Sequence, residues 1–150
     1  MIAIVNKLMS EDLKFNIVML GDSTVGKTCL STCFTEGLFP IAHLPTLGID
    51  QTRKQLKVKG RSVDVLLWDT AGQERLRAVS KNFFTQADAI VLVFDCTNRE
   101  SWENVERWIQ QIDKNACAGV KKILVSNKVD LEEVRDIWEE EGKLEAEKFG

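Results

Sequence analysis

The sequence has little of what marks secreted, zinc-binding or membrane-spanning proteins. Its 150 residues include four cysteines, no Cys-x-x-Cys spacing and a single histidine, which argues against disulfides and zinc. We therefore expect Cys29, Cys33, Cys96 and Cys117 to be buried or half-buried thiols in a reducing compartment. No apolar run approaches the roughly 20 residues that a membrane-spanning helix needs.

The chain also lacks the charge and the targeting signals of several protein classes. The net charge is −3, whereas nucleic-acid binding usually needs a basic face. The stretch from Met1 to Val5 is too short for a signal-peptide core, and no small-residue cleavage site follows it. Ile2 stands where N-myristoylation requires glycine. We expect a soluble, cytoplasmic protein without a nucleic-acid partner. Residues 1–12 are expected to form a mobile N-terminal arm.

What is present is an alternation of apolar strands and amphipathic helices in a chain long enough for one core. Apolar runs predict strands over residues 15–20, 49–58, 62–68, 89–94 and 122–125. The short link Lys59-Gly60-Arg61 makes the second and third strands an antiparallel hairpin. We predict an α/β fold with a mostly parallel sheet and helices on both faces.

Helical periodicity marks the segments between these strands. A helix is expected from Gly26 to about Phe34, and a last helix near residues 133–149. Between them, one helix face collects Trp102, Val105, Trp108, Ile109 and Ile112. In the last helix we expect these side chains to point inward: Val134, Ile137, Trp138 and Leu144. Residues 35–47 hold both prolines and predict a long loop, functional or disordered.

The motif with the most specific chemistry runs from Gly21 to Thr28 and fits the pattern G-x-x-x-x-G-K-[ST]. Glycines let a backbone wrap around phosphates, while free N–H groups and the helix dipole face the negative charge. In this pattern Lys27 contacts the β- and γ-phosphates, and the Thr28 hydroxyl is a Mg²⁺ ligand. The alternative is a plain strand-to-helix turn. The candidate nucleotide contacts are Gly21, Asp22, Ser23, Thr24, Val25, Gly26, Lys27, Thr28 and Cys29.

A second motif, Asp69-Thr70-Ala71-Gly72-Gln73, directly follows an apolar strand. The carboxylate of Asp69 at a strand end can hold Mg²⁺ through water. Gly72 lets a backbone N–H approach a terminal phosphate because no Cβ intervenes, and Gln73 can orient an attacking water. Alone, this motif is as readily a surface turn. Its position after the phosphate motif favours the functional interpretation.

A third motif, Asn127-Lys128-Val129-Asp130, follows the predicted strand 122–125 and indicates which nucleotide base is recognised. The Asp130 carboxylate can accept from N1–H and the exocyclic amine of guanine, a donor pair that adenine lacks. A site built for those donors rejects adenine because its own polar atoms would stay unpaired. Asn127 would bond the base edge or the phosphate loop, and the Lys128 stem would cover the base. In isolation, Asn-x-x-Asp is usually a turn.

Together with Thr46, these motifs resemble those of the Ras superfamily, and the stretches Trp68–Arg75 and Phe94–Asn98 resemble Rab signatures. The similarity covers residues 13–150. It implies a P-loop NTPase G-domain, with Thr46 ligating Mg²⁺ in the GTP state and Phe39 against the guanine edge. Family members continue beyond residue 150 into a sixth strand, a base-binding loop, a final helix and prenylated cysteines. The resemblance therefore predicts exposed apolar sheet surface here, and a cytoplasmic membrane face reached through a C-terminal tail.

The resemblance also implies an exchange factor, a GTPase-activating protein and trafficking effectors that contact the switch regions. The expected contact surface lies around Gln51, Trp68, Leu76 and Phe83. Gln51 and Leu76 stand where the Rab pattern has phenylalanine, and aromatic side chains are frequent interface anchors. We therefore expect an effector set unlike that of typical Rab proteins.

The function implied is a GTP-hydrolysing switch in intracellular vesicle or membrane trafficking. Gln73 would position water, Lys27 and Mg²⁺ would offset developing charge, and Gly72 would sense the γ-phosphate. No arginine of this chain clearly serves as the arginine finger of the hydrolysis reaction, so a partner protein would supply that arginine. A non-cycling domain that serves as a scaffold or regulator-binding module is the alternative. An ATPase or kinase is disfavoured by Asn127 and Asp130.

Overall fold

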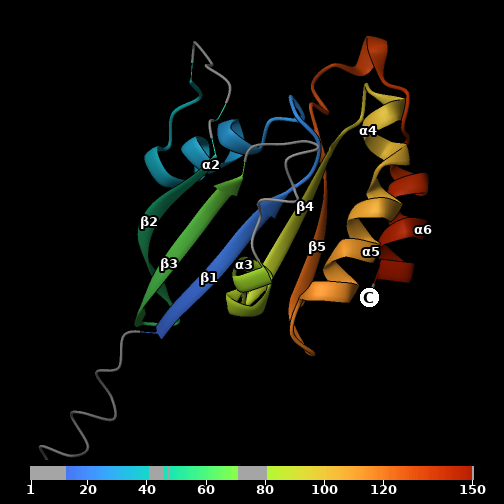
Figure 1. Ribbon diagram of the computed structural model, residues 1–150. Coiled ribbons are helices and arrows are strands. Elements are labelled where there is room, and N and C mark those ends of the chain that lie inside the picture. The colour runs from blue at the N-terminus through green and yellow to red at the C-terminus, as the bar shows by residue number, and fades with distance from the viewer. Residues whose placement is uncertain (1–12, 41–45, 47, 71–80, 150) are drawn as a thin grey trace, which may run out of the picture.

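In the computed structural model, five strands form one sheet in the order β2-β3-β1-β4-β5 (Figure 1). The strands β3, β1, β4 and β5 are mutually parallel, and β2 is antiparallel to β3. The structure describes residues 13–40, 46, 48–70 and 81–149. The strands are β1 (Leu13–Leu20), β2 (Ile49–Val58), β3 (Arg61–Thr70), β4 (Ala89–Asp95) and β5 (Lys121–Asn127). The predicted hairpin and the mostly parallel sheet are confirmed.

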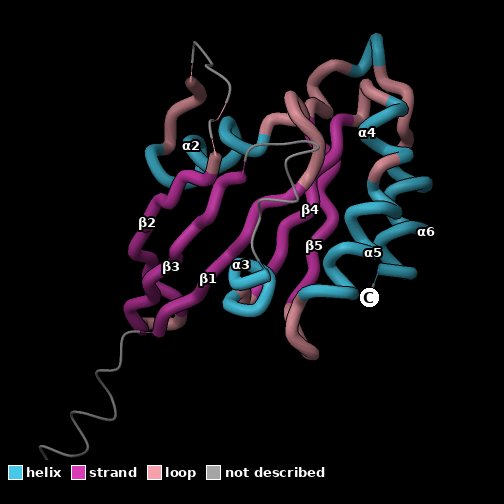
Figure 2. Tube along the Cα trace, in the orientation of Figure 1, coloured by secondary structure: helices cyan, strands magenta, loops and turns pink. Residues whose placement is uncertain are grey.

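Helices lie on both faces of this sheet (Figure 2). They are α2 (Lys27–Glu36), α3 (Lys81–Gln86), α4 (Arg99–Glu103), α5 (Val105–Asn115) and α6 (Glu139–Phe149), with a 3₁₀ turn η2 (Glu132–Val134). Helix α2 packs against β2 and β3, whereas α4 and α5 pack on β4 and α6 contacts β5. In the described part of the chain, no helix is long and apolar enough to cross a membrane.

Two apolar clusters fill the two faces because successive strand residues point to opposite sides. The larger cluster joins residues such as Leu20 and Leu92 to Trp108 and Ile112 of α5. The smaller one, under α2, joins Met19, Val25, Leu67 and Val93. On the same face, three apolar side chains that α2 does not cover are exposed: Leu13, Phe15 and Ile123. Exposed apolar sheet surface is what the resemblance predicted.

The helix predicted over residues 133–149 is shorter than expected. It begins at Glu139, and Val134, Trp138 and Leu144 are exposed, so that the prediction of an inward face was wrong for these three. Ile137 is fully buried as predicted. Val134 belongs to η2 and Trp138 precedes α6, so a helical period counted from residue 133 does not apply to them.

Three smaller predictions are also corrected or left open. The single helix predicted around Trp108 is two helices separated at Asn104, although Trp102, Val105, Trp108, Ile109 and Ile112 all join the core as expected. The thiol of Cys117 is exposed because it lies in the turn after α5, whereas Cys29 and Cys33 are half-buried and Cys96 is buried. Helix α3 was not predicted. The arm over residues 1–12 lies outside the described residues.

Candidate functional site

The phosphate motif forms the loop between β1 and α2. At two positions of this loop, a side chain larger than that of glycine would not fit. Gly21 and Gly26 have φ values of 133° and 97°, a region that favours glycine. A Cβ at Gly21 would lie 2.1 Å from the carbonyl oxygen of Val93, and one at Gly26 would lie 2.4 Å from Nδ2 of Asn127. The loop is therefore packed directly against β4 and β5.

Lys27 is buried inside this loop, with 4% of its surface exposed. Its Nζ donates to the carbonyl oxygens of Gly21 at 2.8 Å and Asp22 at 2.6 Å. Burial lowers the pKa of Lys27 to about 8, against the opposing effect of Asp69 and Asp22. A buried ammonium group in a loop of this kind is suited to an anionic ligand, whose charge would favour the protonated form.

Three oxygen-bearing side chains meet beside Lys27. Thr28 Oγ1 donates to Asp69 Oδ2 at 2.5 Å and lies 2.7 Å from Thr46 Oγ1. The other oxygen of Asp69, Oδ1, is buried and has no hydrogen-bond partner. Burial raises the pKa of Asp69, while Thr28 and Lys27 act in the opposite direction. Hydroxyl and carboxylate oxygens with an unpartnered buried atom fit a hard cation such as Mg²⁺.

The third motif lies at the end of β5, next to the phosphate loop. Asn127 Nδ2 donates to the carbonyl oxygen of Val25 at 2.7 Å, so its contact is with the loop, one of the two expected partners. Lys128 has φ of 61°, and its ammonium group pairs with Asp95 Oδ2 at 2.6 Å. Burial favours the neutral form of Asp95, but hydrogen bonds from Lys128 and Thr97 hold its pKa below the usual range. Asp130 is exposed.

Two carboxylates at this site make polar contacts that escaped the sequence analysis. The Asp22 carboxylate accepts from Trp108 Nε1 at 2.8 Å and from Asn104 Nδ2 at 2.7 Å, which ties the phosphate loop to the start of α5. Asp95 holds Lys128, as described above. Trp108 was recognised only as a core residue, because an indole side chain shows its apolar body in a periodicity pattern and hides its N–H group.

Several other candidates lie apart or cannot be placed. Phe39 is 71% exposed. Gly72, Gln73 and Leu76 lie outside the described residues. On the expected partner surface Gln51 is exposed, and the rings of Trp68 and Phe83 meet edge to face, with centroids 5.2 Å apart.

The motifs nevertheless gather at one place. They follow the carboxyl ends of β1, β3 and β5, which share one edge of the sheet (Figure 1). Ligands of open α/β sheets bind at this edge. The phosphate loop, the Thr28–Asp69 pair and the Asn127 motif are in contact there through hydrogen bonds of 2.5–2.7 Å.

Comparison with known proteins identifies one family. The model of the Ras family matches residues 16–150. Ras-related protein Rab-15 of Homo sapiens is 39% identical over 139 residues, which are 93% of this chain and 66% of that protein. Ras-related protein Rab-1D of Dictyostelium discoideum is 40% identical over 139 residues, 93% of this chain and 68% of that protein.

Ras-related protein Rab-19 of Bos taurus is also similar, at 39% identity over 93% of this chain and 64% of its own length. The chain thus spans about two thirds of the length of these relatives. The family model covers nearly all of the described strands and helices. The chain belongs to the Ras family and, within it, is of the Rab type.

Proposed function

We propose that this chain binds a guanine nucleotide together with Mg²⁺ and acts as a GTP-hydrolysing switch. The observation that carries the proposal is the contact between the phosphate motif and the base motif. Asn127 Nδ2 holds the carbonyl oxygen of Val25 at 2.7 Å, so that the group for the base and the group for the phosphates belong to one site. The similarity to Rab proteins supports the same conclusion.

Within this proposal, the phosphates occupy the loop around Lys27. The ammonium group then exchanges its carbonyl partners for phosphate oxygens, and the loop N–H groups add further donors. Thr28, Thr46 and Asp69 would hold Mg²⁺, whose charge offsets that of the phosphates. Of these three residues, Thr46 belongs to the long loop predicted over residues 35–47, so the position of Thr46 would depend on the γ-phosphate.

Base selection falls to Asp130 and Lys128. The exposed carboxylate of Asp130 is available to accept from the two adjacent donors of guanine. The Lys128 stem would cover one face of the base, and its ammonium group pairs with Asp95 at 2.6 Å. Phe39 is exposed and would gain apolar contact if it closed over the guanine edge.

The hydrolytic roles fall to residues outside the described part of the chain. We assign Gln73 to orienting the attacking water and the Gly72 N–H group to contacting the γ-phosphate. A partner protein would supply an arginine, which raises phosphoryl-transfer rates by about 10³–10⁵-fold in related switches. The whole protein would act in intracellular vesicle or membrane trafficking on the cytoplasmic side. It would bind effectors and regulators through the surface around Gln51, Trp68, Leu76 and Phe83.

The first test is to denature the purified chain and identify any released nucleotide by chromatography. Near-stoichiometric GDP or GTP is the expected result. A folded chain that takes up neither, even after incubation with GDP and Mg²⁺, would contradict the proposal and favour a non-cycling scaffold. Adenine nucleotide would instead contradict the role of Asp130.

The hydrolytic step has its own test in a Gln73→Leu variant. We expect turnover stimulated by a GTPase-activating protein to be lost, while GDP affinity stays within about two-fold, because Gln73 acts on water rather than on the nucleotide. Gln110→Leu, on the exposed side of α5, is the matched control. Undiminished stimulated turnover in Gln73→Leu would remove this residue from the mechanism.

A further inference from the structure

The segment that follows the base motif has few apolar contacts of its own. Between Asp130 and the start of α6 the chain forms only the short turn η2, and Leu131, Val134 and Trp138 are exposed. Ile137 is the fully buried side chain there. A segment with so little burial depends on polar contacts for a defined position. Its position matters because it continues directly from Asp130.

The main chain supplies the first of these contacts. The N–H groups of Asp136 and Ile137 both donate to the carbonyl oxygen of Cys96, each at 2.9 Å. Cys96 in turn donates its N–H to the carbonyl oxygen of Asn127 at 3.1 Å. Cys96, the residue after β4, is therefore hydrogen-bonded both to the base motif, at Asn127, and to the segment after Asp130, at Asp136 and Ile137.

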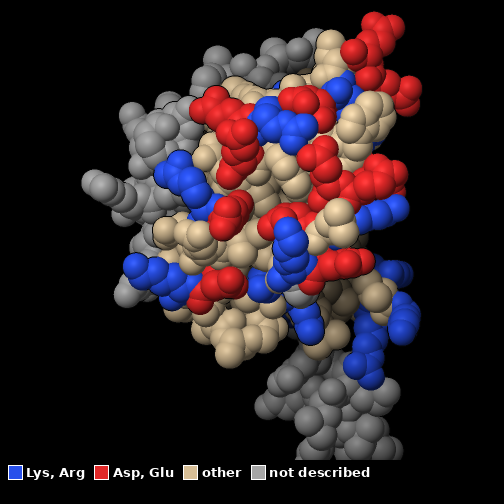
Figure 3. All heavy atoms as spheres, turned by 90° about the vertical axis from the view of Figure 1, so that its right-hand side faces the viewer, with Lys and Arg blue, Asp and Glu red and all other residues tan. Residues whose placement is uncertain are grey.

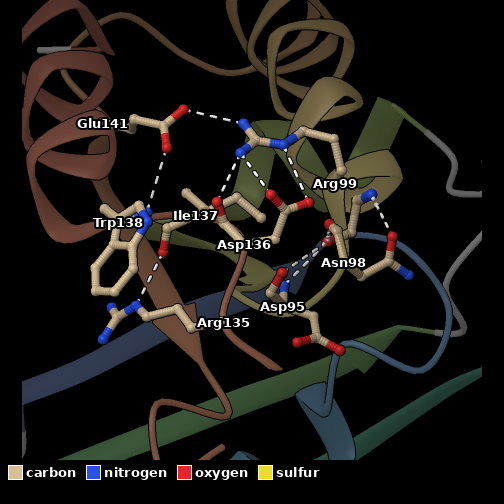
Figure 4. A network of polar contacts seen from close by, with 9 residues as sticks. Asp95, Asn98, Arg99, Arg135, Asp136, Ile137, Trp138 and Glu141 are labelled. Carbon is tan, nitrogen blue, oxygen red and sulfur yellow. Dashed lines mark hydrogen bonds and ion pairs between the residues drawn. The ribbon is translucent and has the colours of Figure 1, made fainter. Parts of the chain in front are cut away.

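Arg99 supplies the second set of contacts, and its whole guanidinium group is engaged (Figure 4). Nη2 donates to the carbonyl oxygen of Asp136 at 2.6 Å and to its Oδ1 at 2.9 Å, while Nε lies 3.3 Å from Oδ2. Nη1 donates to Glu141 Oε2 at 3.0 Å. One side chain thus joins the start of α4 to the segment after Asp130 and to the first turn of α6.

Two features separate Arg99 from an ordinary surface ion pair. Exposed pairs contribute little because long side chains lose freedom for a single screened contact. Here one fixed planar group makes a two-point contact with a carboxylate and also binds a main-chain oxygen. On the side of the molecule drawn in Figure 3, acidic side chains are numerous and lie among basic ones. In addition, the two carboxylates that Arg99 binds, those of Asp136 and Glu141, repel each other. A cation at this point offsets their mutual repulsion.

We propose that Arg99 is a positioning residue for guanine recognition: it holds the segment after Asp130 against the end of β4 and thereby fixes the Asp130 carboxylate. This inference rests on the proposed function. Its physical basis is that Asp130 has to meet two donors of the base at once. A small displacement of the carboxylate therefore weakens both hydrogen bonds, whereas contacts with the phosphates stay unchanged.

The test compares GDP with IDP, which lacks the exocyclic amine of guanine. We expect Arg99→Ala to lower the ratio of the two affinities by about five-fold or more, at the low end of coupling between linked sites. Arg99→Lys keeps the charge but loses the two-point contact, so that its ratio should fall between those of Arg99→Ala and the unaltered chain. Lys143→Ala is the matched control, because Lys143 and its partner Glu139, 2.7 Å apart, both belong to α6, so that this pair does not join α6 to the segment after Asp130.

A second measurement does not depend on nucleotide. Hydrogen exchange of the Asp136 and Ile137 amides should accelerate about ten-fold or more in Arg99→Ala and stay unchanged in Lys143→Ala. If Arg99→Ala binds GDP and its ratio of GDP affinity to IDP affinity is unchanged, the proposed role of Arg99 is overturned, whereas the proposed function stands. Equal loss of GDP and IDP affinity also leaves this ratio unchanged and would overturn the proposed role in favour of a merely structural one. If the unaltered chain binds neither nucleotide, the proposed function fails, and the role of Arg99 fails with it.

Discussion

Thr24 adopts a left-handed conformation in the phosphate loop, with φ of 65°. This conformation is unfavourable for a β-branched side chain, and glycine adopts it without penalty. We expect Thr24→Gly to raise the free energy of unfolding of the nucleotide-free chain by about 0.5–1 kcal/mol, after the greater flexibility of unfolded glycine is allowed for. Urea denaturation measures the change.

A control for this effect lies one turn into the following helix. Thr32 is part of α2, where glycine is unfavourable, so Thr32→Gly should lower the free energy of unfolding by up to about 1 kcal/mol. If both substitutions destabilise the chain equally, the left-handed conformation of Thr24 carries no strain.

Lys27 predicts a dependence of stability on pH. Burial lowers its pKa to about 8 from 10.5, so that between these values the folded chain binds fewer protons than the unfolded chain. The free energy of unfolding therefore rises with pH across this window, and the burial of a charged Lys27 costs about 3 kcal/mol below it. Urea denaturation from pH 7 to pH 10, of the nucleotide-free chain and of Lys27→Met, isolates this contribution. A stability difference that stays constant with pH would contradict the lowered pKa.

At the scale of elements, the contact between the phosphate loop and α5 is made by one carboxylate. Asp22 accepts from Trp108 Nε1 and Asn104 Nδ2, and Trp108 is 4% exposed. Asp22→Ala leaves a buried indole N–H group without a partner, which should lower the free energy of unfolding by about 1–3 kcal/mol. The control is Asp113→Ala, an exposed acid on α5 that pairs with Lys122, with an expected loss below about 1 kcal/mol. Equal losses would mean that Asp22 contributes no more than a surface pair.

The elements also show where sequence patterns succeed. Strands β1, β4 and β5 were predicted because their apolar runs are bounded by turns, and their ends differ from prediction by at most two residues. The last helix was predicted too long, because Val134 and Trp138 happen to continue its period. Instead of a helix, local hydrogen bonds form the turn η2 at Val134, and the N–H groups of Asp136 and Ile137 bind Cys96 just before Trp138.

At the scale of the whole molecule, the two faces of the sheet differ in burial. Ile90 in β4 faces the larger core and is fully buried, whereas Ile123 in β5 lies on the opposite face and is 51% exposed. We expect Ile90→Ala to lower the free energy of unfolding by about 2–5 kcal/mol and Ile123→Ala by less than about 1 kcal/mol. Urea denaturation of both variants checks this difference. A large loss for Ile123→Ala would show that its face is covered in solution.

Much of the candidate site could be predicted because its residues lie in contiguous motifs. Lys27, Thr28 and Asp69 were assigned from their own neighbours in sequence, and the structure brings Thr28 and Asp69 to 2.5 Å. The contacts of Asp22 with Trp108, of Asp95 with Lys128 and of Arg99 with Asp136 could not be predicted in this way. Each joins segments from different strands or helices, and no local pattern records which distant side chain will be opposite.

The sequence by itself determined the alternation of strands and helices, the family motifs and the order in which they follow the strands, because each depends on local periodicity and on the spacing of a few residue types. Only the tertiary structure decided which sheet face is covered, where the last helix begins and which side chains hold the base motif in place. These features depend on the pairing of β1 with β3 and β4, which brings distant segments to one edge of the sheet. Burial and hydrogen bonding there are properties of the packed chain, since the partners are far apart in sequence.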